Sequence, residues 1–244
     1  MNKENQNGQS TESVEQNISF FKNNIDTYNA QVQNIDSYKI IRSQINKAIS
    51  GIDYLLDIGN GGVFDYNVNL VSKIVGLDLF LDNLPKNFSC PPNVVMKSGS
   101  ALDIPEKDNT FDGVIKVMLI HHLIGKDVES SINNVKTSIK EAHRVLKPGG
   151  KLIVVESCVP RWFYYFQKIA FPVTSRVIDK IFKHPATLQY PAHLLQKFLK
   201  EKFNEITIDK VPLGKWVLIY GLKVPTILTP VSVNIFVARK QSLS

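Results

Sequence analysis

Hydrophobic and polar positions alternate in short blocks between residues 52 and 157, in the manner of strands and helices that follow one another. Five near-continuous apolar runs, each short enough for one strand, lie at residues 52–58, 74–80, 93–101, 111–119 and 151–157. Residues 67–73 predict a short helix and residues 130–146 a long amphipathic one, which ends at a "KPGG" turn. This alternation predicts a mostly parallel sheet covered by helices on both faces.

The two ends of the chain have other patterns. Residues 1–17 contain one valine and no aromatic residue, which predicts a disordered tail. Apolar residues recur at helical spacing between 18 and 50, so two amphipathic helices are expected there. Residues 205–211 and 231–240 are predicted as two further strands, joined by a Pro- and Gly-punctuated stretch too long for a tight hairpin. We therefore expect one domain over residues 18–244.

Three glycines and a carboxylate mark the end of the first predicted strand. Gly59, Gly61 and Gly62 let backbone N–H groups approach a ligand, and Asp57 at the strand's tip can accept a hydrogen bond from a ligand ammonium. A dinucleotide fingerprint would need a third glycine at position 64, where Phe64 stands. The pattern therefore favours a different ligand from a nicotinamide or flavin dinucleotide.

A second carboxylate, Asp78, ends the next predicted strand nineteen residues after Gly59. In parallel sheets this spacing brings an acid beside the glycine loop, where it can accept hydrogen bonds from two ribose hydroxyls. A helix cap is the alternative role for this residue. The ribose role predicts a nucleoside ligand.

Four segments together carry a family resemblance: "LLDIGNGG", "GLDLF", "GSALDIPEKDNTFDGVIKVMLIHHL" and "EAHRVLKPGGKLIVVES". In this order and spacing they resemble the class I S-adenosylmethionine-dependent methyltransferases, particularly the small-molecule branch that includes the ubiquinone/menaquinone-biosynthesis methyltransferases. The resemblance implies a Rossmann-like, doubly wound α/β fold with a mostly parallel seven-stranded sheet whose last strand is antiparallel. It implies the following parts: an N-terminal helical cap (18–50), a cofactor-binding core (52–157), a helical substrate-covering insertion (158–204) and the final strands (205–240).

The resemblance also implies S-adenosyl-L-methionine as the cofactor. The implied cofactor-binding residues are Asp57, Gly59, Asn60, Gly61, Asp78, Leu79, Ser100, Ala101, Leu102, Lys116 and Val117. Three positions depart from the family pattern. Val63 replaces a third glycine, Ser100 stands where an acid or amide is common, and Lys116 would repel a sulfonium, so we expect its amine to point away.

Two histidines follow the fourth predicted strand, at the cofactor end of the sheet. Methyl transfer chiefly needs alignment of the acceptor with the methyl group, but a base helps when the acceptor is a hydroxyl or an acidic carbon. His121 and His122 are the candidate bases, because imidazole titrates near neutrality. Their alternative role is to begin the next helix and bond locally.

The variable segment after the fifth strand is aromatic and basic. Three candidate substrate-binding residues, Trp162, Tyr165 and Phe166, lie on one helical stripe of this segment, and core packing is their alternative role. The other candidates are His184 in the same segment and Tyr28 in the N-terminal helical cap. Such a surface suits a small hydrophobic or aromatic acceptor with an acidic group. After Cys158 there are 13 Lys/Arg and 4 Asp/Glu, so a peripheral membrane contact is a further prediction.

Composition limits the remaining possibilities. No secretion signal or membrane-spanning run is present, which predicts a cytoplasmic protein, and the two cysteines lack the spacing of a metal site. The leading hypothesis is a small-molecule methyltransferase directed at oxygen or carbon. One alternative is an RNA methyltransferase, favoured by the pI of 9.2, although no RNA-binding module is present and no nucleic-acid partner is expected. Another is a protein of this fold that binds the cofactor without methyl transfer.

Overall fold

The fold is taken from a computed structural model that describes residues 36–85, 87–182, 186–219 and 222–242. The predicted tail at residues 1–17, the first of the two N-terminal helices, Tyr28 and His184 lie outside the described residues.

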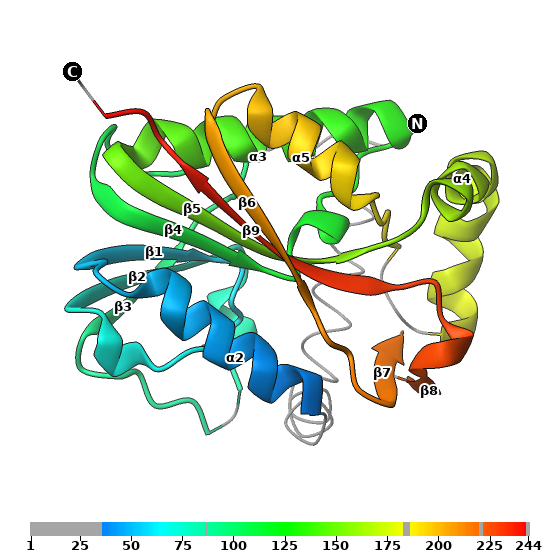
Figure 1. The fold of residues 1–244 in the computed structure, drawn as a ribbon, viewed down its shortest axis with the longest axis horizontal. Helices are drawn as coiled ribbons and strands as arrows, with labels where there is room; N and C mark the ends of the chain where they lie inside the picture. The colour runs from blue at the N-terminus through cyan, green and yellow to red at the C-terminus, as the bar shows by residue number, and fades with distance from the viewer. Residues whose placement is uncertain (1–35, 86, 183–185, 220–221, 243–244) are drawn as a thin grey trace.

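A seven-stranded sheet forms the centre of the molecule (Figure 1), with strand order β3-β2-β1-β4-β5-β9-β6. Its strands are β1 (Tyr54–Ile58), β2 (Lys73–Asp78), β3 (Val94–Ser98), β4 (Phe111–Val117), β5 (Leu146–Cys158), β6 (Glu205–Val211) and β9 (Ser232–Arg239). Strands β1 to β5 are parallel, and β9 is antiparallel to both β5 and β6. The Rossmann-like α/β fold and its antiparallel last strand are thus confirmed.

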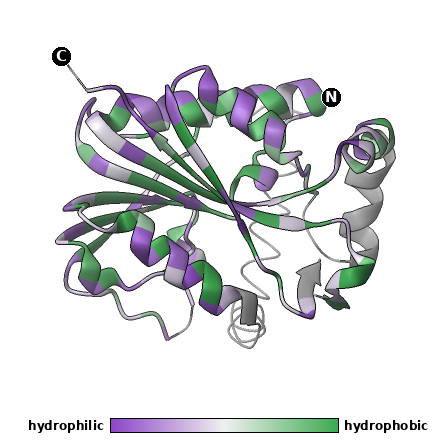
Figure 2. Cartoon of the chain, viewed as in Figure 1, coloured by the Kyte–Doolittle hydropathy of each residue, from purple (hydrophilic) through white to green (hydrophobic). Residues whose placement is uncertain are grey.

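Helices cover both faces of this sheet, as the amphipathic patterns predict. Helix α2 (Asp36–Ile49) packs on one face through Ile41, Ile45 and Ile49, which are buried at a helical spacing of four residues. Helices α3 (Val128–Val145) and α5 (Ala192–Lys200) cover the other face. Figure 2 shows hydrophobic and hydrophilic residues alternating around these helices, so each buries one side. The carboxyl ends of the parallel strands are left free to carry the site.

Helix α3 begins and ends where its sequence provides signals. Asp127 and Ser130 form a reciprocal capping box at its N-terminus, with the Ser130 N–H donating to Asp127 Oδ1 at 2.7 Å. At the other end the chain passes directly into β5, and Gly149 has a φ of +78°. Strand β5 therefore includes the predicted "KPGG" turn, and its pairing with β4 shifts register there.

One local prediction is wrong. Residues 67–73 form only the three-residue 3-10 helix η1 (Val68–Leu70), because Asn67 accepts the N–H of Asn69 and β2 already begins at Lys73, which leaves no room for an α-helical turn. The stretch between β6 and β9 is too long for a tight hairpin, as predicted. It contains the antiparallel pair β7 (Trp216–Ile219) and β8 (Leu222–Pro225), followed by η4 (Thr226–Leu228).

Candidate functional site

The glycine loop after β1 needs its glycines for backbone reasons. Gly59, Gly61 and Gly62 have φ values of +75°, +56° and +79°, in the region that side chains disfavour. A Cβ on Gly59 would also lie 2.7 Å from Cδ1 of Leu119, so this loop is in close contact with the segment that follows β4. Val63 lies outside the positive-φ positions. Valine in place of a third glycine at this position therefore adds no backbone strain to the turn.

Asp78 lies at the tip of β2 beside this loop, as predicted. Its Oδ2 accepts the N–H of Gly61 at 2.9 Å, and its Oδ1 accepts the N–H of Phe80 at 2.9 Å. Leu79 continues the chain between these contacts and is partly buried. Each carboxylate oxygen has a second lone pair, so Asp78 can hold the glycine loop and still accept two hydroxyl donors.

Asn60 supports the loop from within. Its Oδ1 accepts the N–H of Gly62 at 2.8 Å, which closes a local turn typical of asparagine. The Val63 N–H donates to the Asn60 carbonyl at 2.8 Å. The side chain of Asn60 thus shapes the loop.

Asp57 is a carboxylate buried at the end of β1, with only 2% of its surface exposed. The Tyr66 hydroxyl donates to its Oδ2 at 2.8 Å. Burial raises the pKa of Asp57 to about 7, although the hydrogen bond from Tyr66 lowers it. The nearby charges are the carboxylates of Asp65 and Asp78, which raise this pKa further. The tip of β1 is therefore a buried region of negative potential.

Ser100 begins the loop between β3 and β4, and its side chain is committed to a turn. Its Oγ accepts the N–H of Leu102 at 3.1 Å, and the Asp103 N–H donates to its carbonyl at 3.3 Å. Ala101 lies between them and packs against the core. A serine here can thus form the tight turn without an acid or amide.

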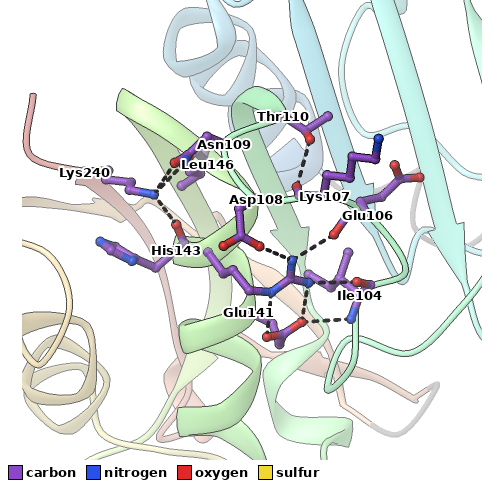
Figure 3. Close-up of polar contacts among 11 residues, drawn as sticks. Ile104, Glu106, Lys107, Asp108, Asn109, Thr110, Glu141, His143, Leu146 and Lys240 are labelled. Atoms are coloured by element: carbon purple, nitrogen blue, oxygen red, sulfur yellow. Dashed lines mark hydrogen bonds and ion pairs between the residues drawn. The ribbon is translucent and has the colours of Figure 1, made fainter. Parts of the chain in front are cut away.

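The same loop is clamped to α3 by a carboxylate–guanidinium pair (Figure 3). Glu141 Oε2 accepts the Ile104 N–H at 3.0 Å, while Arg144 donates to the carbonyls of Ile104 and Glu106, each at 2.8 Å. Arg144 also bonds Asp108 at 2.8 Å. The "EAHRVLKPGG" segment therefore positions the loop that follows Ser100.

Lys116 and Val117 end β4. Lys116 is buried, and its Nζ donates to the carbonyl and hydroxyl of Ser138 in α3 at 2.7 and 2.5 Å. Its amine thus points into the α3 layer, away from the glycine loop, as the charge argument predicts. Burial lowers the pKa of Lys116 to about 7. Met118, the next residue but one, has a φ of +51°, an uncommon value for a side-chain-bearing residue that marks a sharp turn.

That turn leads into η3 (Ile120–His122), which carries both candidate histidines. His121 Nδ1 lies 2.6 Å from Oε1 of Glu156 at the end of β5, and the imidazole rings of His121 and His122 contact each other at a tilt of 40°, with centroids 4.2 Å apart. Glu156 has no exposed surface. Its Oε2 accepts the Ile120 N–H at 2.8 Å, and its Oε1 accepts the Ser157 N–H at 2.7 Å. The carboxylate therefore fixes the orientation of His121.

The aromatic residues predicted to bind substrate lie elsewhere. Trp162, Tyr165 and Phe166 are 60–66% exposed on helix α4 (Arg161–Phe182). Tyr165 lines a cavity of about 280 Å³ between α3, α4 and α5. Substrate contact by these aromatic residues stays a prediction.

The sequence reasoning missed four contributors to this site. Glu156 lies inside an apolar strand, and an acid in such a strand is itself a signal because burial of a charge needs compensation. Asp65 and Tyr66 lie a few residues after the glycine loop, and the left-handed backbone of Met118 leaves no sequence signal.

Comparison with known families and curated proteins agrees with this geometry. Residues 56–154 match the family described as "Methyltransferase domain". The chain is 27% identical over 174 residues to the demethylmenaquinone methyltransferase of Oceanobacillus iheyensis, a match that covers 64% of this chain and 69% of that protein. Two Geobacillus proteins of the same name match this chain over only 54% and 58% of their own length.

Solved structures share the fold at low sequence identity. The N-methyltransferase NodS from Bradyrhizobium japonicum, in complex with S-adenosyl-L-homocysteine, is similar with a TM-score of 0.55 and 12% identity, covering 86% of this chain and 90% of that one. The [4+2]-cyclase SpnF is similar with a TM-score of 0.55 and 17% identity, covering 83% and 80%. The fold is therefore shared with proteins of different reactions.

Proposed function

We propose that this chain is a class I S-adenosylmethionine-dependent methyltransferase, which methylates a small hydrophobic or aromatic acceptor at oxygen or carbon. The observation that carries the proposal is the pairing of His121 with the buried carboxylate of Glu156, on the segment that contacts the glycine loop through Leu119. This pairing supports a general base at the edge of the sheet where the cofactor is proposed to bind.

The charges at the tips of β1 and β2 fit the cofactor. Asp57, Asp65 and Asp78 interact electrostatically, and burial leaves Asp57 with a raised pKa. A ligand that carries an ammonium and a sulfonium would relieve this repulsion, whereas a phosphate would increase it. When bound, S-adenosylmethionine supplies an electrophilic methyl group. Asp57 would bind the ammonium, and Asp78 would accept the ribose hydroxyls while it holds the Gly61 N–H.

The remaining predicted cofactor contacts divide between backbone and side chains. Gly59, Gly61, Leu79, Lys116 and Val117 would contribute backbone at the strand ends, since the amine of Lys116 is engaged by Ser138. The turn formed by Ser100 would present Ala101 and Leu102 to the adenine. Asn60 would act by holding the glycine loop in shape.

His121 is proposed as the general base. Glu156 already accepts backbone N–H groups from Ile120 and Ser157, so it acts as an acceptor and His121 Nδ1 must donate to it. The other ring nitrogen, Nε2, then keeps its lone pair and can remove a proton from a hydroxyl or an acidic carbon. His122 contacts this ring at a tilted angle and is the second candidate. The arrangement suits an acceptor that must lose a proton when the methyl group is transferred.

The proposed chemical class of the acceptor is inferred from the curated relatives. Proteins named as demethylmenaquinone methyltransferases act on a quinone-type ring, which agrees with a hydrophobic aromatic acceptor. Residues 158–204 are proposed to cover it, with Trp162, Tyr165, Phe166, Tyr28 and His184 as the predicted contacts.

A direct assay tests the proposal. The purified chain is incubated with S-adenosylmethionine and with the reduced, hydroquinone form of demethylmenaquinone or a catechol, and the products are examined by mass spectrometry for the gain of one CH2. Calorimetry with S-adenosylmethionine and its demethylated product is run in parallel. Methylation of either acceptor supports the proposal. Cofactor binding without methylation of these or of RNA would instead favour a cofactor-binding protein without methyl transfer, and methylation of RNA alone would favour the RNA alternative.

A further inference from the structure

Helix α4 exposes an apolar face that no described residue covers. Trp162, Tyr165, Phe166 and Ile169 follow one another at helical spacing and are 66%, 60%, 61% and 83% exposed. Single exposed apolar side chains are common on protein surfaces, whereas four large ones on one helical stripe mark an interaction surface.

A second exposed apolar segment lies toward the same end of the molecule. Figure 1 shows the β7–β8 pair and η4 at the end of the long axis that α4 occupies. There Ile227 and Leu228 are 93% and 73% exposed, and Trp216 is 44% exposed. Both tryptophans of the chain, Trp162 and Trp216, therefore lie at this end.

The polar residues among these apolar ones are all neutral or cationic. Residues 159–171 and 212–231 contain no aspartate or glutamate, but they contain Arg161, Lys168, Lys215 and Lys223. The Nζ of Lys223 lies 5.6 Å from the ring centroid of Trp216, and that of Lys168 lies 5.9 Å from that of Tyr164. Ammonium groups beside aromatic rings are typical of residues placed at the boundary between water and an apolar phase.

The cavity beside the stripe adds a concave basic site. Its lining combines three cationic side chains and a histidine with aromatic and aliphatic ones: Ile132, Lys136, Arg161, Tyr164, Tyr165, Lys168, Pro191, His193, Leu194 and Phe198. Arg161 Nε donates to His193 Nε2 at 3.0 Å, so the guanidinium is oriented. Lys136 is paired with Glu201 at 2.7 Å, which leaves Arg161 and Lys168 as the cations of this lining for which no ion pair to a described residue is found. Tyr165 belongs to both the cavity and the exposed stripe.

We propose that this end of the molecule docks onto an anionic membrane surface. The aromatic and aliphatic side chains of α4 and η4 insert at the level of the lipid headgroups, and the cavity at Arg161 and Lys168 receives a headgroup phosphate. The charge of this surface favours an anionic membrane as its partner, because an apolar face with cations and without carboxylates is complementary to an anionic bilayer. None of the helices in the described part of the chain is long and apolar enough to cross a membrane, and the contact proposed here lies in the interface.

Vesicle binding tests the proposal without cofactor or acceptor, so its outcome is independent of methyl transfer. The full chain is titrated with vesicles of pure phosphatidylcholine and with vesicles in which about a third of the lipid is phosphatidylglycerol. We expect binding to the anionic vesicles alone, weakened by salt, with a blue shift of tryptophan fluorescence. Trp162→Phe and Trp216→Phe separate the signals, and both tryptophans are expected to report insertion.

One introduced charge, one charge reversal and one matched control locate the surface. Ile169→Glu and Lys168→Glu should each reduce binding to the anionic vesicles by about tenfold or more. Leu70→Glu, at an exposed leucine on η1, should leave binding unchanged while adding the same charge as Ile169→Glu. Equal binding by all variants, no binding to either vesicle, or a concentration-dependent dimer that Ile169→Glu dissociates would overturn the proposal.

Discussion

His121 Nδ1 lies 2.6 Å from Oε1 of Glu156, a carboxylate that has no exposed surface. A buried carboxylate needs donors, and Glu156 has them from the backbone of Ile120 and Ser157 as well as from the imidazole. Glu156 lies in β5, and His121 lies in η3 directly after the neighbouring strand β4, so the pairing of β4 with β5 brings the two residues together. The pair therefore connects the fold to the proposed chemistry.

The first prediction concerns this pair. His121→Ala should lower turnover by about 10²- to 10⁴-fold, because the acceptor proton then has no positioned base. Glu156→Gln should lower it by about tenfold or more, because the histidine loses its preferred tautomer. Cofactor affinity, measured by calorimetry, should change little in His121→Ala.

The control for this experiment is His143→Ala. His143 lies in α3 with its ring against Phe203, at a centroid distance of 5.1 Å, and takes no part in the pair. Full turnover in His121→Ala, or an equal loss in His143→Ala, would remove the dyad from the mechanism. Circular dichroism of each variant separates loss of catalysis from loss of fold.

The second prediction is a pH dependence of cofactor affinity. The pKa of Asp57 is about 7 in the ligand-free protein, and an ammonium beside it needs the ionised form. Below pH 7 the carboxyl must lose a proton on binding, so affinity should fall toward tenfold per pH unit as pH decreases, and should level off above about pH 8. Calorimetry in two buffers of different ionisation enthalpy will count the released proton.

Asp57→Asn should bind more weakly with a flat pH profile over this range. The matched control is Asp53→Asn, which removes an exposed carboxylate just before β1 and should keep the slope. If the affinity of Asp57→Asn depends on pH with the same slope as that of the wild type, a group other than Asp57 causes the pH dependence.

The site was predictable where chemistry requires a particular residue at a strand end. Asp57, Asp78 and the glycines could be located from the sequence, because the carboxyl ends of adjacent parallel strands must meet at one edge. The partner of His121 could not, because 35 residues separate it from Glu156 and only the register of β4 and β5 brings them together. The same reason applies to Arg144, whose contacts lie 36–40 residues away in the loop after Ser100.

The third prediction concerns Lys116 and stability. Burial lowers its pKa to about 7, against an ordinary value near 10.5, while Glu141 partly opposes this. The folded state therefore binds fewer protons than the unfolded state between these pH values, and the free energy of unfolding should fall as pH decreases from about 10 to 7, by at most roughly 1.4 kcal/mol per pH unit.

Lys116→Met should remove this contribution, since a thioether of similar length fills the space without a charge. Urea denaturation of both proteins over the same pH series isolates the effect, because other lysines with lowered pKa values, such as Lys151 and Lys240, are shared. Parallel stability curves would contradict a buried, titrating amine.

The fold was predictable to a similar degree and for a different reason. Residues 205–211 form β6 with the predicted bounds, and α3 begins within two residues of its prediction, because long periodic patterns report burial directly. The failure at residues 67–73 is instructive: the spacing permits a helix, but Asn67 closes a local turn and β2 takes the following residues. Short segments are decided by such local competition.

The fourth prediction concerns Asp78. Asp78→Ala should weaken cofactor binding by about 10- to 100-fold, because both the ribose acceptor and the support of the glycine loop are lost. The N–H groups of Gly61 and Phe80 lose their acceptor, so their hydrogen exchange should quicken even without ligand. Asp78→Asn retains one acceptor and should weaken binding less. An unchanged dissociation constant in Asp78→Ala would count against the ribose contact.

The last prediction tests whether Arg144 acts on the cofactor through the loop that it clamps. In Arg144→Ala the carbonyls of Ile104 and Glu106 and the Glu141 carboxylate lose a charged donor, so the free energy of unfolding should fall by about 1–3 kcal/mol. Because the loop begins at the proposed adenine contacts, affinity for S-adenosylmethionine should fall as well. Lys240→Ala is the matched control, since Lys240 ties the C-terminal segment to Asn109, to His143 in α3 and to Leu146 at the start of β5 by three bonds of its own (Figure 3). It should cost similar stability but leave affinity unchanged, so equal losses of affinity in both variants would mean that general loosening, and not the clamp, controls the adenine side.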